Sequence, residues 1–332
     1  MIRTTVVGSW PLPEMYRDRL QQYHRGVLPA MLIKPTLVGA AEMAIREQKA
    51  TGVTQFMGGE LFAEVFIQHI PRQLTGVRLL KPQATELKAY TDVAEYEIIA
   101  DINAPHGLGY VDGFRREVQI DPALEKVSVP GPLEVLSHLR PVEKAQTQLP
   151  RAIEIVNREI KALVALGARE IQLDVPFIAV RSVLGAMPPE QAVEMVEQSF
   201  SGVHAVKTIH CCLGDLGSQP VLTVHNLQAL MPFVQQLGGV VDKVHLECSH
   251  PGQWADRACL RDIPKDMEVV AGLVDVKSAV ETADAIADHM KELLRLVEPE
   301  RLWFAPSCGF GRRTTEIAIG KLSRMVEAAK RF

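Results

Sequence analysis

The feature that most constrains this 332-residue chain is a repeated alternation of β-rich runs with helical runs. Eight apolar, β-branched runs have the length of strands, and nearly all precede a stretch with helical spacing. Alternating β and α units predict a parallel sheet, and eight of them predict an α/β fold of the (β/α)8 TIM barrel type, with residues 1–332 as a single domain. The expected strands are Thr4–Val7, Val53–Met57, Lys126–Val129, Glu170–Leu173, Ala205–Ile209, Val241–Leu246, Met267–Val276 and Leu302–Ala305.

An open doubly wound sheet is the alternative architecture for such a pattern. That fold would suit a glycine-rich phosphate loop after an early strand. The early Gly58-Gly59-Glu60 does not fit the GxGxxG spacing, so the barrel is the better prediction.

The alternation is interrupted between residues 91 and 120. The stretch Asp101–Gly107 is rich in turn-forming residues and lies between two alternating runs. We therefore expect a β-hairpin insertion near residues 91–120.

Composition excludes several classes of protein. The chain is 47% hydrophobic and 23% charged, with a net charge of -4 and no basic stripe, which argues against nucleic acid as a partner. No apolar run approaches the ~20 residues of a membrane span, and the N-terminal residues lack the apolar core of a signal peptide. Five cysteines are an odd number for a disulfide framework. We expect a cytoplasmic chain with no membrane contact that uses cysteine for metal binding or catalysis.

Polar side chains recur where the expected strands end, which is where a barrel gathers its active-site residues. His210 and Cys212 are two residues apart and therefore share a face if the strand continues through them. Together with Glu247 and Cys308 at later strand ends, they would give two thiols, one imidazole and one carboxylate, a donor set that fits zinc. The remaining strand-end residues are Ser9, Glu60, Asp174, Asp275 and Lys277.

Simpler roles compete for several of these residues. Glu60 and Asp174 could cap the helices that follow them, although a ring of such residues makes that less attractive. His245 is expected to be a core or helix-facing histidine rather than a ligand. Buried structural thiols are expected at Cys211, Cys248 and Cys259.

At these residues the chain resembles the catalytic C-terminal half of cobalamin-independent methionine synthase, and especially its short single-barrel forms. The resemblance implies a zinc-dependent methyltransferase that methylates the thiol of homocysteine to give methionine. It implies that Ser9, Glu60 and Asp174 hold the substrate and that Asp174 and Lys277 are catalytic, Lys277 standing where the family has a proton-relay histidine. It places the zinc ligands at His210, Cys212, Glu247 and Cys308. The motifs that carry it are Gly8-Ser9-Trp10-Pro11, Gly59-Glu60, Pro130-Gly131-Pro132, Gln172-Leu173-Asp174, His210-Cys211-Cys212, Glu247-Cys248-Ser249, Gly272-Leu273-Val274-Asp275-Val276-Lys277-Ser278 and Pro306-Ser307-Cys308-Gly309.

One departure from the family bears on the methyl donor. Folate-using members carry an aromatic residue downstream of the Gly-Pro motif, whereas the stretch Gly131–His138 has no tryptophan. The resemblance to the short forms implies a methylcorrinoid donor, either methylcobalamin alone or bound to a corrinoid protein partner, rather than methyl-tetrahydrofolate.

Two rival functions remain open. The first is zinc-dependent alkyl transfer to another thiol, as in an epoxyalkane:coenzyme M transferase, whose sulfonate would need a cation. Arg17, Arg19, Lys34 or Lys277 could supply it. The second is a purely structural zinc site closed by four ligands.

Overall fold

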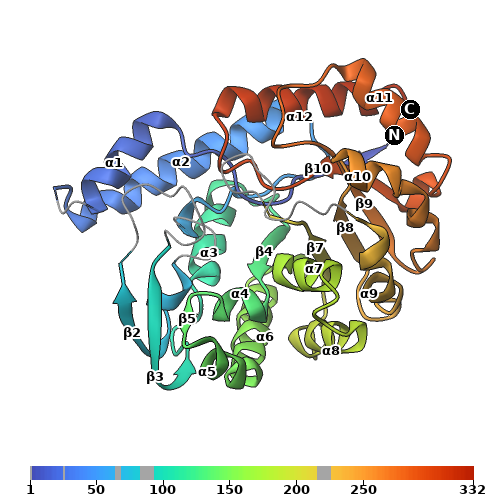
Figure 1. Cartoon of the computed structure of the whole chain (residues 1–332). Helices are drawn as coiled ribbons and strands as arrows, with labels where there is room; N and C mark the ends of the chain where they lie inside the picture. Colours follow the sequence, from blue (N-terminus) through green and yellow to red (C-terminus); the bar gives the residue numbers. More distant parts are fainter. Residues whose placement is uncertain (1, 25–26, 64–68, 83–92, 215–225) are drawn as a thin grey trace.

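The main sheet is parallel and curls around a packed interior. The structure is a computed structural model that describes all residues except 1, 25–26, 64–68, 83–92 and 215–225. Seven strands pair in the order β1-β10-β9-β8-β7-β6-β4, and the pairs are all parallel (Figure 1). Their bounds are β1 Arg3–Thr4, β4 Lys126–Pro130, β6 Glu170–Asp174, β7 Val206–Cys211, β8 Lys243–Glu247, β9 Glu268–Val274 and β10 Leu302–Pro306. The predicted α/β parallel architecture is confirmed.

The second expected strand, Val53–Met57, is not a regular strand. It meets β1 through a single parallel bridge between Thr5 and Gln55. The buried Gln48 side chain bonds both the carbonyl oxygen (2.9 Å) and the amide of Met57 (3.2 Å), which satisfies backbone groups that a neighbouring strand would otherwise pair. In the described part of the chain, the main sheet therefore has seven strands plus this bridge, not eight regular strands.

The expected β-hairpin near residues 91–120 is wrong. Strand β3 (Glu95–Asn103) pairs antiparallel with the upstream strand β2 (Thr75–Lys81) and parallel with β5 (Leu139–Arg140), forming a separate three-stranded sheet. Figure 1 shows this sheet at the lower left, beside the helices α5 (Val142–Thr147) and α6 (Leu149–Ala165). The second half of the stretch is the helix α3 (Tyr110–Ile120).

Helix α3 forms because its apolar residues recur at helical spacing and its first turn is capped from elsewhere. Tyr110 and Phe114 are four residues apart and both are buried. The carboxylate of Glu159 accepts hydrogen bonds from the amides of Leu108 (2.8 Å), Tyr110 (2.9 Å) and Val111 (3.1 Å). A carboxylate at a helix N-terminus satisfies free amides and is favoured by the helix dipole. This cap is distant in sequence, so local pattern could not reveal it.

The remaining helices pack around the sheets, and the short helix α4 (Pro132–Leu136) is buried over its whole length. The expected helix Val224–Leu237 is shorter in the structure, where a 3-10 turn at Gln228–Leu230 leads into α9; residues 224 and 225 lie outside the described part. Among the described helices, none is both long and apolar enough to span a bilayer. The helices are α1 Glu14–His24, α2 Ala30–Thr51, α4 Pro132–Leu136, α5 Val142–Thr147, α6 Leu149–Ala165, α7 Pro176–Val183, α8 Pro189–Ser199, α9 Met231–Gln235, α10 Pro251–Ala255, α11 Ala283–Leu293 and α12 Thr315–Ala329.

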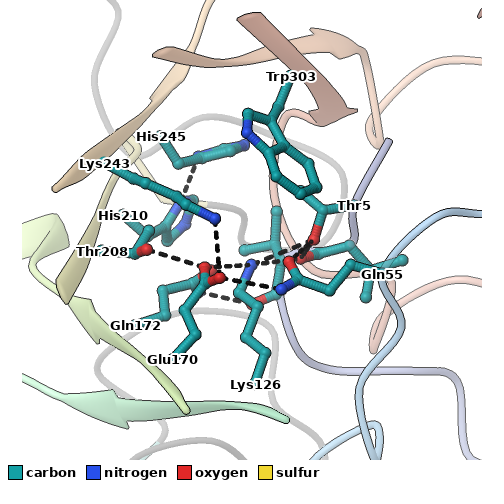
Figure 2. Close-up of polar contacts among 12 residues, drawn as sticks. Thr5, Gln55, Lys126, Glu170, Gln172, Thr208, His210, Lys243, His245 and Trp303 are labelled. Atoms are coloured by element: carbon teal, nitrogen blue, oxygen red, sulfur yellow. Dashed lines mark hydrogen bonds and ion pairs between the residues drawn. The ribbon is translucent and has the colours of Figure 1, made fainter. Parts of the chain in front are cut away.

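Inside the main sheet, the amino ends of the strands are tied together by a charged network around Glu170 (Figure 2). One Glu170 oxygen accepts from Thr208 (2.8 Å), and the other accepts from Gln55 and Lys243 (2.9 Å each). Lys126 lies 4.0 Å away and donates to the Val6 carbonyl (2.9 Å). Burial alone would raise the pKa of Glu170, but the two lysines outweigh it and the pKa is lowered. The interior is thus filled by paired charges at this end, which leaves the carboxyl ends for the site.

Candidate active site

Three side chains of types that commonly bind metals meet at the carboxyl ends of β7 and β10. His210 is the second-to-last residue of β7, Cys212 directly follows the strand, and Cys308 lies two residues after β10. The Cys308 sulfur lies 3.9 Å from the Cys212 sulfur and 3.9 Å from Nε2 of His210. A tetrahedral zinc ion would separate two thiolate sulfurs by about 3.8 Å and a sulfur from an imidazole nitrogen by about 3.6 Å. The spacing of these atoms therefore fits a zinc ion.

The exposure of the cluster fits a reactive site better than a closed structural one. His210 and Cys212 are buried, whereas Cys308 is half-buried. Hydrogen bonding to Cys308 and burial raise the pKa of Cys212, and a metal ion would reverse that by favouring the thiolate. A catalytic zinc site keeps one position open, while a structural site has four protein ligands.

Glu247, the expected fourth ligand, is held by other groups. Among the described residues, the set whose ligand atoms all lie within 4.8 Å of one another contains His210, Cys212 and Cys308 but not Glu247. One Glu247 oxygen accepts from the Leu213 amide (3.0 Å), and the other pairs with the Lys277 ammonium at 2.5 Å. Burial would lower the pKa of Lys277, but the charge of Glu247 outweighs it and the pKa is raised. Lys277 therefore neutralises Glu247 beside the cluster.

Two acidic side chains, Asp174 and Glu60, interact electrostatically near this cluster. Asp174 is the last residue of β6 and the sheet neighbour of His210 in β7. The backbone of Glu60 has a φ of 59°, in the left-handed region. Desolvation raises the pKa of Glu60 to about 7, partly offset by the hydrogen bond from Ser128. Burial and then the charge of Glu60 raise the pKa of Asp174 well above its usual range, although Gln172 donates to it at 2.7 Å. Two mutually repelling acids favour a cation between them.

Ser9 lies against the loop that carries Cys308. Its carbonyl accepts from the Phe310 amide at 2.7 Å, and a Cβ at Gly309 would come within 2.2 Å of its hydroxyl. A Cβ at Gly8 would come within 2.1 Å of a Glu60 oxygen. Glycine at both positions therefore leaves room for the Glu60 carboxylate beside residue 8 and for the Ser9 hydroxyl beside residue 309.

The remaining cysteines lie outside the described cluster. Cys211, Cys248 and Cys259 are all buried, and burial raises the pKa of each thiol, that of Cys259 to about 11. Thiols of this kind are unreactive.

Several residues of the site were missed by sequence reasoning. Gln172 is two residues before Asp174 on the same strand, and His245 is two residues before Glu247. That i, i+2 spacing is a signal that each shares a face with the site residue. Ser128 carries no comparable signal, because its partner Glu60 is far away in sequence. The expectation that His245 faces the core holds, but it does so beside His210, not toward the helices.

Comparison with known proteins shows the family to which the chain belongs. Residues 2–331 match the family model described as the cobalamin-independent synthase catalytic domain. The chain belongs to this family. Methionine synthases from Sulfolobus acidocaldarius and Saccharolobus solfataricus are 23% and 24% identical to it, over 98% and 99% of this chain and 91% and 94% of theirs. A B12-independent methionine synthase from Shewanella sp. W3-18-1, solved with selenomethionine, shares the fold with a TM-score of 0.83 at 19% identity, covering 99% of this chain and 97% of that one.

Family membership confirms the resemblance and the class of enzyme. Proteins of this family are zinc-dependent methyltransferases, and this chain is methionine synthase-like. A cobalamin-independent family argues against the expected methylcobalamin donor and against a corrinoid protein partner. The absence of tryptophan in Gly131–His138 therefore does not indicate which compound donates the methyl group. In the structure the His138 ring is buried, with Nδ1 bonded to the Ala94 carbonyl at 3.0 Å.

Proposed function

We propose that this protein transfers a methyl group to the thiol of homocysteine, giving methionine, with zinc held by His210, Cys212, Cys308 and Glu247. The observation that carries the proposal is the position of an acidic pair directly beside a thiol-rich metal cluster. When bound, zinc supplies a positive charge that lowers the pKa of a substrate thiol. We further propose that residues 1–332 act as one domain and that the Gln55 segment closes the barrel between β1 and β4.

The substrate amine is assigned to the acidic pair. Burial destabilises both Asp174 and Glu60 as anions, and the charge of Glu60 further destabilises Asp174, so an ammonium group between them relieves an existing cost. Gln172 fixes one Asp174 oxygen through its amide, whose nitrogen also donates to the Val7 carbonyl at 2.6 Å. In this proposal Asp174 orients the amino acid so that its sulfur reaches the metal cluster, and Ser9 borders the same space.

Lys277 is assigned to Glu247. Glu247 would hold zinc together with the other three ligands, and its carboxylate would need another partner whenever it does not, because an unpaired buried charge is costly. Lys277 is that partner, with its ammonium 2.5 Å from the carboxylate. The substrate sulfur forms a bond to the methyl carbon while the bond from that carbon to the donor breaks.

The rival transfer to coenzyme M fits less well. A sulfonate needs a free cation, whereas the Lys277 ammonium is already paired and the substrate side is acidic. Arg17 and Arg19 donate to the Leu12 carbonyl and to Thr36, both at 3.4 Å, and the Lys34 side chain lies outside the described part.

The test is methyl transfer by the purified zinc-loaded protein. Homocysteine is supplied with methyl-tetrahydrofolate in one reaction and with methylcobalamin in another, and methionine is measured. Methionine formation with either donor supports the proposed acceptor. Failure with both, together with alkylation of coenzyme M by an epoxide, would overturn the proposal in favour of the rival.

A further inference from the structure

His245 lies against the metal cluster without belonging to it. Its Cα is the sheet partner of His210 across β7 and β8, so the two side chains project to the same side of the sheet. The Nδ1 atoms of the two rings are 2.6 Å apart, and the ring centroids are 4.6 Å apart (Figure 2). His245 is 1% exposed, so water cannot replace its hydrogen-bonding partners.

The second nitrogen of His245 fixes which nitrogen carries the proton. Nε2 lies 2.9 Å from the carbonyl oxygen of Pro306. A carbonyl only accepts, so Nε2 must carry a hydrogen. In a neutral imidazole the other nitrogen, Nδ1, is then an acceptor. The hydrogen between the two rings must therefore come from Nδ1 of His210.

In this tautomer Nε2 of His210 carries no hydrogen and can bind a metal ion. With its hydrogen on Nδ1, His210 has its lone pair on Nε2, the atom that lies 3.9 Å from the Cys308 sulfur. If His245 presented a hydrogen instead, His210 would carry its own on Nε2 and could not bind a metal there. Pro306 is two residues before Cys308, so His245 also ties the His210 ring to the strand end that supplies a second ligand.

Gly272 in the neighbouring strand β9 leaves space for the His245 ring. A Cβ at Gly272 on β9 would come within 2.9 Å of Nε2 of His245. A larger residue there would push the ring away from Pro306. The absence of a side chain at Gly272 therefore serves the His245 contact.

We propose that His245 is a positioning residue that holds His210 in the tautomer and orientation required of a metal ligand, through the chain Pro306 carbonyl, His245, His210. The inference rests on the proposed zinc site. Histidine ligands are commonly held by a second hydrogen bond, and loss of such a partner typically weakens metal affinity by about 10- to 100-fold. Here that partner is another histidine, and its own tautomer is set by the backbone.

The experiment compares His245→Phe with His245→Asn. Phenylalanine keeps the ring volume but removes both nitrogens, and it should weaken zinc binding by about 10- to 100-fold, measured by competition with a chelator. Asparagine offers an amide oxygen near the position of Nδ1, and it should keep zinc affinity within about threefold of wild type. The control is His69→Gln, which changes another buried histidine that contacts a carbonyl, that of Leu108, and should leave zinc affinity unchanged.

A second measurement needs no folded variant of His245. Nitrogen NMR of metal-free wild-type protein labelled at histidine should show His210 with its hydrogen on Nδ1, the signal being assigned by its loss in His210→Asn. A hydrogen on Nε2 of His210 would overturn the inference, as would wild-type zinc affinity in a folded His245→Phe protein. Full zinc affinity in His210→Asn would instead overturn the proposed metal site, so the two failures are distinguishable.

Discussion

The ion pair between Lys277 and Glu247 is expected to contribute strongly to the free energy of unfolding. The Lys277 side chain is 10% exposed and that of Glu247 is 2% exposed, so neither charge is well hydrated. In Lys277→Met the buried Glu247 carboxylate keeps its hydrogen bond from the Leu213 amide but loses the Lys277 ammonium. Removing one member of a buried pair costs about 3–5 kcal/mol. We expect that loss in the free energy of unfolding of the metal-free protein.

Removing the charge of Glu247 as well should restore most of the lost stability. In Lys277→Met combined with Glu247→Gln no unpaired charge remains, and stability should return to within about 1–2 kcal/mol of wild type. The coupling energy between the two sites follows from the two single variants and the double variant. Zinc should also reduce the loss in Lys277→Met, because Glu247 is then free to bind the metal, and anything that binds the folded state stabilises it.

The assay is urea unfolding of each protein under reducing conditions, without metal and with saturating zinc. Lys277→Arg, which keeps the charge, serves as the control. A loss below about 1 kcal/mol in metal-free Lys277→Met would show that the pair is not a strong buried interaction, contrary to the usual cost of breaking one. An equal loss with and without zinc would refute the idea that Glu247 is shared between Lys277 and the metal.

Three further outcomes are expected. Cys308→Ser should lose zinc while Cys259→Ser keeps it, as measured by metal analysis; retention in Cys308→Ser would contradict the ligand assignment. Asp174→Asn should weaken homocysteine binding by about 2 kcal/mol with zinc content unchanged, measured by calorimetry, and unaltered binding would remove Asp174 from the substrate site. Burial raises the pKa of Glu134 from 4.5 to about 7, so the folded state holds its proton more tightly and stability falls as pH rises through that range. Glu134→Gln should therefore gain on the order of 2–3 kcal/mol relative to wild type between pH 5 and pH 8, and an unchanged pH dependence would argue against a buried anion.

The sequence alone determined the parallel α/β architecture and which side chains at the strand ends are candidate metal ligands. Both are local properties: apolar runs of strand length alternate with helical spacing, and residues two apart on a strand share a face. His210, Cys212 and Cys308 could therefore be selected as strand-end residues before their distances were known. Assigning them roles needed the family resemblance as well.

Tertiary structure decided which strands pair and how each backbone group is satisfied. The antiparallel pairing of β2 with β3 and the cap that Glu159 gives to α3 both join residues far apart in sequence. Gln48 occupies the backbone groups of Met57, which interrupts strand pairing where the pattern predicted an ordinary strand. Such partners are set by the folded arrangement, and no local propensity encodes them.

The same reason separates the predicted from the unpredicted parts of the site. A metal ligand is recognisable from its chemistry, but the partner of a ligand depends on the register between two strands. The contact of His245 with His210 exists because β7 and β8 align these two residues. The pairing of Glu247 with Lys277 likewise joins the end of β8 to the loop after β9. Only the folded chain brings these side chains within a few ångströms of one another, and at that distance they set each other's charge and hydrogen positions.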